Sequence, residues 1–257
     1  MKKFILLIML GLLVTAGLLT GCGIIVTPSG PESTRDYKIT DFSNINVGGP
    51  FEAQIIQADN YKVTITANEN LFKYVDISKT GSTLNVKTRP LSLVGSHVLK
   101  AEISLPKLGD LSVSGGARSD VSGFNSTGKM DIKVSGGAQL NMDITTGDTN
   151  IAISAGSNVK GDLKSNNTKI NLSAGSQCNI AGSGADTALV LSAGSAADLV
   201  DFNATAVDVR LSAGSRASVR TDGRLDIRVS DGSTLVYYGS PDIGTIETSG
   251  GSTIRHD

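Results

Sequence analysis

The clearest pattern in the chain is an alternation of apolar and polar residues in eight short segments between residues 110 and 249. In each segment aliphatic residues fill two positions separated by one residue, with Thr248 as the one exception. The first of these positions holds, in chain order, Leu111, Ile132, Ile151, Ile170, Leu189, Val209, Ile227 and Ile246. Because successive side chains of a strand point to opposite faces, the pattern predicts eight half-buried β-strands.

Each segment ends in a Ser-x-Gly element, so the alternation is part of a repeat. Consecutive repeat serines are 21, 19, 19, 19, 20, 18 and 19 residues apart. The serines and glycines are Ser114 and Gly116, Ser135 and Gly137, Ser154 and Gly156, Ser173 and Gly175, Ser192 and Gly194, Ser212 and Gly214, Ser230 and Gly232, and Ser249 and Gly251. A period near 20 residues is typical of a solenoid, in which each coil buries its apolar face only by stacking on its neighbours.

The residues around each repeat glycine predict a narrow corner. Gly or Ala precedes the glycine in every coil except the seventh, which has Asp231, and Ala or Ser follows it. The glycine can adopt a positive φ at such a bend. Stacked about 4.8 Å apart, the repeat serines are expected to hydrogen-bond to one another or to neighbouring backbone. At Asp231 we expect a local distortion or an outward-turned side chain.

The predicted fold is an all-β, single-stranded parallel β-helix with coils of about 19 residues, right-handed by the general rule for crossovers. No segment after Gly21 carries a capped apolar helical stripe, which excludes solenoids built from helices. Residues 109–257 hold the eight repeats. Residues 37–108 are β-rich without a period, and we interpret them as wider, irregular coils that cap the open core. Their strand candidates are residues 45–47, 51–56, 61–67, 74–78, 84–87 and 98–105, with a helical turn beginning at Glu69.

The N-terminus has the pattern of an export signal followed by a tether. Two lysines precede an apolar run over residues 4–19, which is slightly short for a membrane-spanning helix. Cys22 directly follows Leu-x-Gly, which resembles a bacterial lipoprotein box, where the signal is cleaved before the cysteine and the thiol is acylated. We therefore interpret residues 1–21 as a lipoprotein signal peptide, the alternative being an ordinary signal with an incidental cysteine. Residues 22–36 are expected to form a flexible tether.

The net charge and the small number of histidines and cysteines limit the functions that the chain can have. Cleavage would move the net charge from −1 to −3, because 21 basic residues then face 24 acidic ones, without the basic clusters that nucleic-acid binding needs. Cys178 occupies a repeat position of small apolar residues and is predicted to be buried. His97 and His256 are expected to be solvated, which argues against a catalytic triad or a zinc site. Of the adjacent aromatic residues Tyr237 and Tyr238, one should point inward.

Three features of the chain together carry a family resemblance. They are the segment 41–57, which reads Asp-Phe-Ser-Asn-Ile-Asn-Val-Gly-Gly-Pro-Phe-Glu-Ala-Gln-Ile-Ile-Gln, the Ser-Gly-Gly-Ala and Ser-Ala-Gly-Ser repeats, and the Tyr-Tyr-Gly-Ser-Pro turn at 237–241. They resemble the family called putative auto-transporter adhesin, head GIN domain, over residues 37–254. The resemblance implies a single-stranded right-handed β-helix in lipoproteins or secreted proteins of Bacteroidetes-type bacteria. It brings no catalytic residues and no cofactor.

Two pairs of carboxylates are the remaining candidates for catalysis or metal binding. Asp110 with Asp131, and Asp208 with Asp226, are expected to be adjacent on neighbouring coils. Carboxylates about 5 Å apart can bind Ca²⁺ or form a retaining glycosidase pair. We favour a solvated outer face, because the even coil spacing leaves no long loops to build a catalytic groove.

The sequence thus predicts a non-enzymatic outer-membrane lipoprotein of the cell envelope. It would be an adhesin or binding β-helix, held by lipid at Cys22, that contacts an unknown protein or glycan and no nucleic acid. One alternative is a polysaccharide lyase or hydrolase on the same fold, and another is a structural envelope protein that self-associates through its open ends or through edge strands. The residues after Cys22 lack an acidic cluster, which favours the periplasmic over the surface face.

Overall fold

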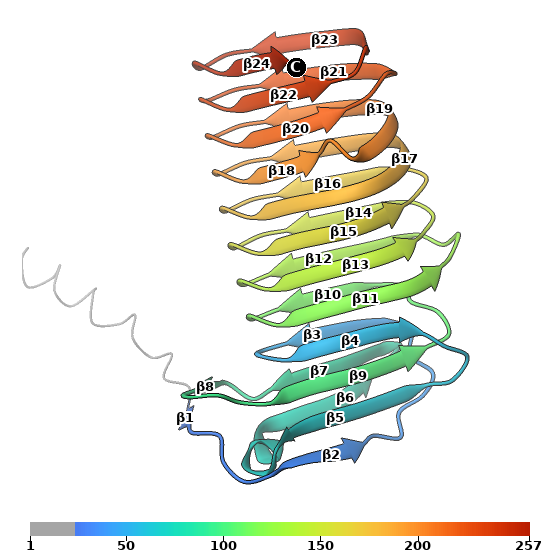
Figure 1. Ribbon diagram of the computed structural model, residues 1–257, viewed down its shortest axis with the longest axis vertical. Helices are drawn as coiled ribbons and strands as arrows, with labels where there is room; N and C mark the ends of the chain where they lie inside the picture. The colour runs from blue at the N-terminus through green and yellow to red at the C-terminus, as the bar shows by residue number, and fades with distance from the viewer. Residues whose placement is uncertain (1–23) are drawn as a thin grey trace, which may run out of the picture.

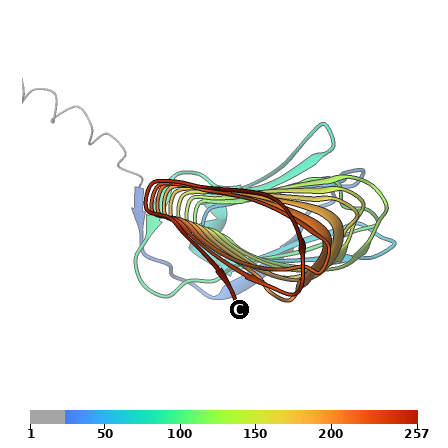
Figure 2. The ribbon, with the colours of Figure 1, turned by 90° about the horizontal axis from the view of Figure 1, so that it is seen from above.

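The computed structural model describes residues 24–257, so the signal peptide and Cys22 lie outside it. The chain is a β-solenoid of about eight turns with a spacing near 19 residues, which confirms the predicted fold class. The coils stack along the long axis of the molecule (Figure 1). Seen along that axis, they share one narrow edge and open into a wider bend at the other (Figure 2).

Each coil contains two strands joined at the narrow corner. The first strands are β10 (Leu111–Ser114), β12 (Met130–Ser135), β14 (Thr149–Ile153), β16 (Thr168–Leu172), the end of β17 (Gln177–Leu191), the end of β19 (Phe202–Leu211), β21 (Arg224–Val229) and β23 (Asp242–Thr248). The second strands are β11 (Arg118–Asn125), β13 (Gln139–Thr145), β15 (Asn158–Lys164), the start of β17, β18 (Ala196–Leu199), β20 (Arg216–Arg220), β22 (Thr234–Tyr238) and β24 (Thr253–His256).

The parallel register places equivalent residues of successive coils directly against each other. Leu111 pairs with Ile132, Ile132 with Ile151, and the same ladder continues to Ile246 in the last coil. Every member before Ile246 is at most 1% exposed and belongs to one continuous core. Burying one such side chain contributes about 1.5–3 kcal/mol, so the ladders are the main source of stability.

The N-terminal cap does not follow chain order, which corrects the expected series of wider coils. Its first coil consists of β3 (Asn44–Gly48) and β4 (Glu52–Gln57), and its next of β7 (Thr83–Thr88) and β9 (Leu99–Leu105). The repeats nevertheless stack on the first of these, because β10 pairs with β3 and β11 with β4, while β7 and β9 lie on their far side. The chain therefore runs away from the repeats and returns past β3 and β4 to begin them.

Antiparallel strands close the lower end of the solenoid. β5 (Lys62–Asn68) pairs antiparallel with β9 and with β2 (Glu32–Asp36), and β6 (Val75–Thr80) pairs antiparallel with β7. A short 3₁₀ helix, Glu69–Tyr74, follows β5 at the expected helical turn and buries two apolar side chains. The outermost strand, β2, is largely exposed and polar, and such edges resist pairing with another sheet.

Two strands, at residues 24–26 and 32–36, stand where the flexible tether was expected. β1 (Ile24–Val26) pairs parallel with β8 (Leu91–Leu93), and Val26 is buried in the core. β2 is held by its ladder to β5 and by Arg35, whose guanidinium lies 3.9 Å from the centre of the Phe72 ring. Composition alone suggested a linker, because the partners of these strands lie far away in the sequence. No helix within residues 24–257 is long and apolar enough to span a membrane.

Candidate functional site

The narrow corners are built by two consecutive residues with positive φ. In the fourth coil Ala174 has φ 52° and Gly175 has φ 69°, the combination of a type I′ turn. The sequence predicted this conformation for the glycine but not for the residue before it, where a side chain costs about 1–2 kcal/mol. Asp231 adopts the same conformation, with φ 57°, and its side chain turns outward to accept a hydrogen bond from Ser230 Oγ at 2.9 Å.

The repeat serines lie half-buried at the ends of the first strands, except for the exposed Ser249. Two repeat serines bond to neighbouring backbone as expected, because the Ser212 and Ser230 hydroxyls donate to Leu191 O at 3.4 Å and to Leu211 O at 3.5 Å. The most deeply buried hydroxyls belong to the residue three positions later. Ser176 and Ser195 are at most 1% exposed, and each donates its hydroxyl to the carbonyl of the repeat serine before it, at 2.7 Å. The backbone carbonyl of the repeat serine is thus the acceptor that satisfies these two buried hydroxyls.

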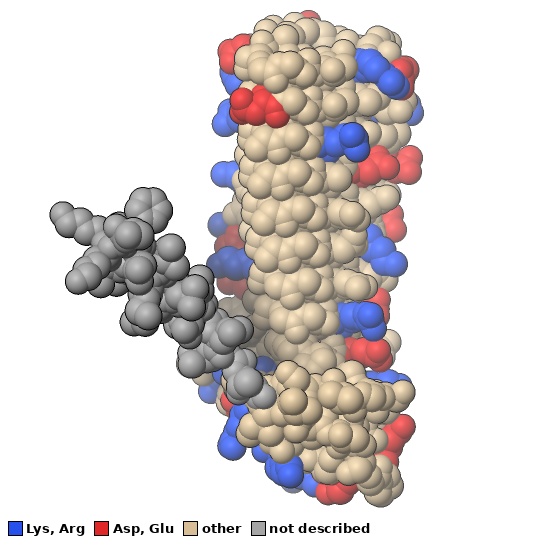
Figure 3. Space-filling model, turned by 90° about the vertical axis from the view of Figure 1, so that its left-hand side faces the viewer, with Lys and Arg blue, Asp and Glu red and all other residues tan. Residues whose placement is uncertain are grey.

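Stacking of these corners produces an edge of small, uncharged residues that runs along the solenoid (Figure 3). In four coils its exposed residues are Ala and Gly, and Asp231 is the charged exception. Charged side chains flank this edge on both sides (Figure 3). Groups able to recognise a polar ligand therefore lie on the broad faces and at the wide bend.

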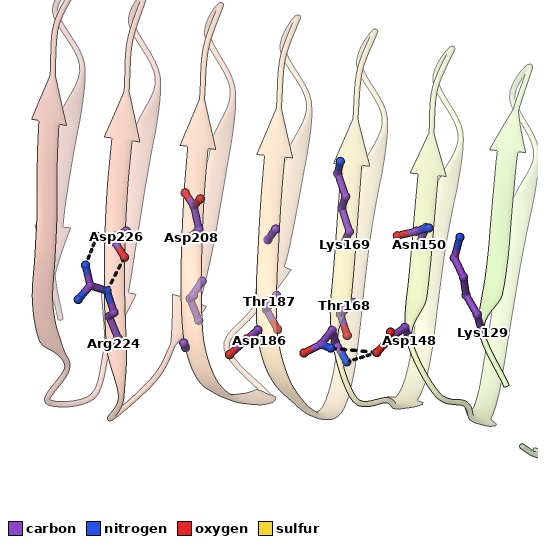
Figure 4. Close-up of a pocket in the computed structure, with 14 residues that line it drawn as sticks. Lys129, Asp148, Asn150, Thr168, Lys169, Asp186, Thr187, Asp208, Arg224 and Asp226 are labelled. Carbon is purple, nitrogen blue, oxygen red and sulfur yellow. Dashed lines mark hydrogen bonds and ion pairs between the residues drawn. The ribbon is translucent and has the colours of Figure 1, made fainter. Parts of the chain in front are cut away.

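A shallow groove of about 550 Å³ crosses the first strands where they leave the wide bend. Figure 4 shows side chains from successive parallel strands arranged in a row across it. Its lining residues are Lys129, Asp148, Asn150, Asn167, Thr168, Lys169, Asp186, Thr187, Ala188, Ala206, Val207, Asp208, Arg224 and Asp226. The spacing of about 4.8 Å between coils makes these polar groups a regular series.

Sequence reasoning missed this groove, although a signal for it exists. Asp148, Asn167 and Asp186 each stand six positions before a repeat serine, so polar residues recur there every 19 residues. In the structure they lie on neighbouring coils, and Asp148 Oδ1 accepts hydrogen bonds from the backbone N–H and the side-chain amide of Asn167, at 3.2 and 3.0 Å. The residues of the wide bends vary from coil to coil, and this variation hid the recurrence of a polar residue six positions before each of these repeat serines.

Both carboxylate pairs predicted from the sequence are adjacent. Asp208 pairs in register with Asp226. The backbone N–H of Asp131 donates to Asp110 Oδ1 at 3.3 Å. The pKa of Asp131 is lowered, chiefly by a hydrogen bond from the Asn150 side chain and also by Lys129.

Arginines neutralise the second pair. Asp208 forms ion pairs with Arg210 at 2.6 Å and with Arg228 at 3.5 Å, and Arg224 Nε donates to Asp226 at 2.7 Å. The hydrogen bonds from Arg224 and from the backbone N–H of Thr245 lower the pKa of Asp226 to about 2. A retaining glycosidase needs one carboxyl with a raised pKa as the general acid, and the lowered pKa of Asp226 does not suit that role.

The remaining candidates take structural positions. His256 stacks on Tyr237 with ring centres 4.6 Å apart, and Tyr237 packs against the core while Arg220 lies over the ring of Tyr238. His97 is exposed in a loop. Cys178 is buried as predicted, and burial raises the pKa of its thiol to about 12. Across residues 24–257 no three His, Cys, Asp or Glu side chains gather as metal ligands.

Comparison with known proteins gives one family match and several similar folds. The model of the family described as "putative auto-transporter adhesin, head GIN domain" matches residues 41–241. A "putative lipid binding protein" from Parabacteroides distasonis has a TM-score of 0.83 at 19% identity, covering 90% of this chain and 99% of its own. A "putative adhesin" from Parabacteroides merdae has a TM-score of 0.83 at 16% identity, covering 91% and 100%. At such identities the likeness shows the fold, and no curated protein matches the chain.

Proposed function

Since the chain belongs to the family described as "putative auto-transporter adhesin, head GIN domain", we propose that it is a non-enzymatic, lipid-anchored binding protein of the cell envelope. Its ligand would be an extended glycan or peptide that lies across the coils. The descriptions of similar structures as a "putative adhesin" and as a "putative lipid binding protein" support a binding role. The acyl group at Cys22 would hold the protein on the membrane, most firmly with several chains, since one chain alone binds reversibly.

The observation that carries this proposal is the groove across the first strands. Its lining alternates cations such as Lys129 and Lys169 with anions such as Asp148 and Asp186, all on neighbouring coils. A series of donors and acceptors at a fixed spacing suits a long polar ligand with its own repeat. The groove is shallow and has no long loops over it, so it fits an elongated ligand better than an enclosed small molecule.

Binding to arrays of bacterial and host glycans, followed by titration of each hit, tests the groove. We expect Lys169→Ala and Asp186→Ala each to weaken binding by about tenfold, which corresponds to about 1.4 kcal/mol. Lys160→Ala is the matched control, because Lys160 is an exposed lysine on the second strand β15 and does not line this groove. Equal affinity of the groove variants and the control for every bound ligand would contradict the proposed site.

Protease treatment of intact cells tests the location that adhesion requires. Loss of the mature protein, with a periplasmic protein left intact as a lysis control, is the result expected of an adhesin. Complete protection would contradict adhesion, and crosslinking would then identify the periplasmic partner. Metabolic labelling with a fatty-acid analogue, lost in Cys22→Ser, tests the anchor independently.

A further inference from the structure

The small sheet formed by β1 and β8 presents apolar side chains that nothing within residues 24–257 covers. Ile24, Ile25 and Val94 are 60%, 74% and 56% exposed. Ile25 and Val94 lie on the same side of the ribbon, because Ile25 pairs with Ser92 and the backbone N–H of Val94 donates to Val26 O at 3.1 Å. This two-stranded ribbon stands at the side of the cap, separate from the large sheet (Figure 1).

The ribbon has two different faces. Val26, Leu91 and Leu93 pack against the core and hold the ribbon to the cap. Alternation turns their neighbours Ile25 and Ser92 to the other side, and Val94 follows in the same phase. The outward face therefore consists of Ile25, Ser92 and Val94, and it is apolar apart from one hydroxyl.

The charges around the ribbon and its place in the chain indicate what covers it. Residues 24–31 and 89–99 contain no acidic residue, and Arg89 stands two positions before β8. Gly23 alone separates Ile24 from Cys22, a distance of at most about 7 Å for extended chain. An acyl chain on Cys22 would thus hold the ribbon at the bilayer interface, where basic residues near the surface also meet anionic headgroups.

We propose that the outward face of the β1–β8 ribbon lies against the membrane that holds the acylated Cys22. This inference rests on the lipid anchor of the proposed function. The ribbon then acts as a second point of attachment. It fixes the orientation of the cap at the bilayer, whereas a lipid anchor alone would let the solenoid rotate about it. A tether of disordered residues would not do this, and the structure has ordered strands in its place.

Labels that report contact with lipid test the proposal on the full-length acylated protein in phosphatidylethanolamine–phosphatidylglycerol vesicles. Val94→Cys and Ser92→Cys would each carry an environment-sensitive fluorophore on the outward face. Ile246→Cys is the control, since Ile246 is 52% exposed in the last coil. The native thiols do not interfere, because Cys178 is 2% exposed and Cys22 is acylated. We expect brominated phospholipids to quench the labels at 92 and 94 at least twofold more than the label at 246.

Flotation of the same samples separates failure of the docking from failure of the anchor. If the protein floats with the vesicles but the labels at 92 and 94 are quenched no more than the control, the docking is wrong and the anchor stands. A blue-shifted label that brominated lipid does not quench would mean that a protein covers the ribbon, which also overturns the proposal. A protein that does not float would overturn the anchor and the docking together.

Discussion

At the scale of single residues, equivalent positions of successive coils differ in whether a buried polar side chain finds a hydrogen-bond partner. Thr168 faces inward and shares a hydrogen bond with Ser165, three positions earlier. Thr187 occupies the same position in the next coil, but Gly184 replaces its partner and leaves the buried hydroxyl without a hydrogen bond. A Cβ at Gly184 would lie 3.1 Å from the Phe202 ring, so a serine there would require the ring to move by a few tenths of an ångström. A lone buried hydroxyl costs about 1–3 kcal/mol, which this coil tolerates.

Cys178 gives a prediction about alkaline stability. Burial raises the pKa of its thiol from an ordinary value near 9.0 to about 12, so the folded protein keeps a proton that the unfolded chain releases. The protonated thiol contributes fully to the free energy of unfolding below pH 9. Between pH 9 and about 12 this contribution falls by up to about 1.4 kcal/mol per pH unit. We expect Cys178→Ala, which copies Ala197 and Ala217 of later coils, to remove this part of the pH dependence. Urea unfolding of both proteins at pH 8 and pH 10.5 measures it, and parallel pH profiles would contradict it.

At the scale of the element, two classes of glycine hold different positions. Gly175 turns a narrow corner with φ 69°, and a Cβ there would meet nothing within 4 Å. Gly161 lies inside β15 with φ 124°, and a Cβ there would stand 2.0 Å from the carbonyl oxygen of Met142 on the neighbouring coil. Gly175 is needed only because the backbone has a positive φ, whereas Gly161 is needed also because two paired strands leave no room for a Cβ.

The glycine classes predict unequal losses of stability. Gly175→Ala should lower the free energy of unfolding by about 1–2 kcal/mol, the cost of a left-handed residue. Gly161→Ala should lower it by about 3 kcal/mol or more, because the strand must also move away from β13. Urea denaturation compares the two variants directly. Equal losses would show that close strand approach at Gly161 adds nothing.

At the scale of the whole molecule, the two ends of the solenoid differ. The lower end is closed by the antiparallel strands of the cap, and β10 and β11 rest on β3 and β4. The upper end is open, and Ile246 is already half exposed there. In a solenoid each coil contacts mainly its neighbours, so the loss of an end coil and the loss of a cap have different consequences.

Truncation tests this asymmetry. A chain that ends after Tyr238 loses only β23 and β24, and we expect it to stay folded and monomeric with reduced stability. The fragment 109–257 loses the cap and exposes the lower edge of the core, so we expect it to aggregate or to remain unfolded. Sedimentation velocity and circular dichroism distinguish these states. A folded monomer of residues 109–257 would show that the cap is dispensable.

The sequence by itself determined the coil. The alternation at Leu111 and its equivalents, the glycine corners and the period near 19 residues predicted the strands and their register, because each coil repeats the same local stereochemistry. It also predicted the burial of Cys178 and the adjacency of the aspartates, since stacking brings equivalent positions together.

Only the tertiary structure decided the path of the cap, the ribbon and the groove. Ile45 pairs with Leu111, and Ile24 with Leu91, although no repeat in the sequence relates these residues. The polar row at Asp148, Asn167 and Asp186 became a groove through the shape of the wide bends around it. Long-range pairing depends on which apolar surfaces remain uncovered once the coils have formed, and that is a property of the assembled molecule and not of any single segment.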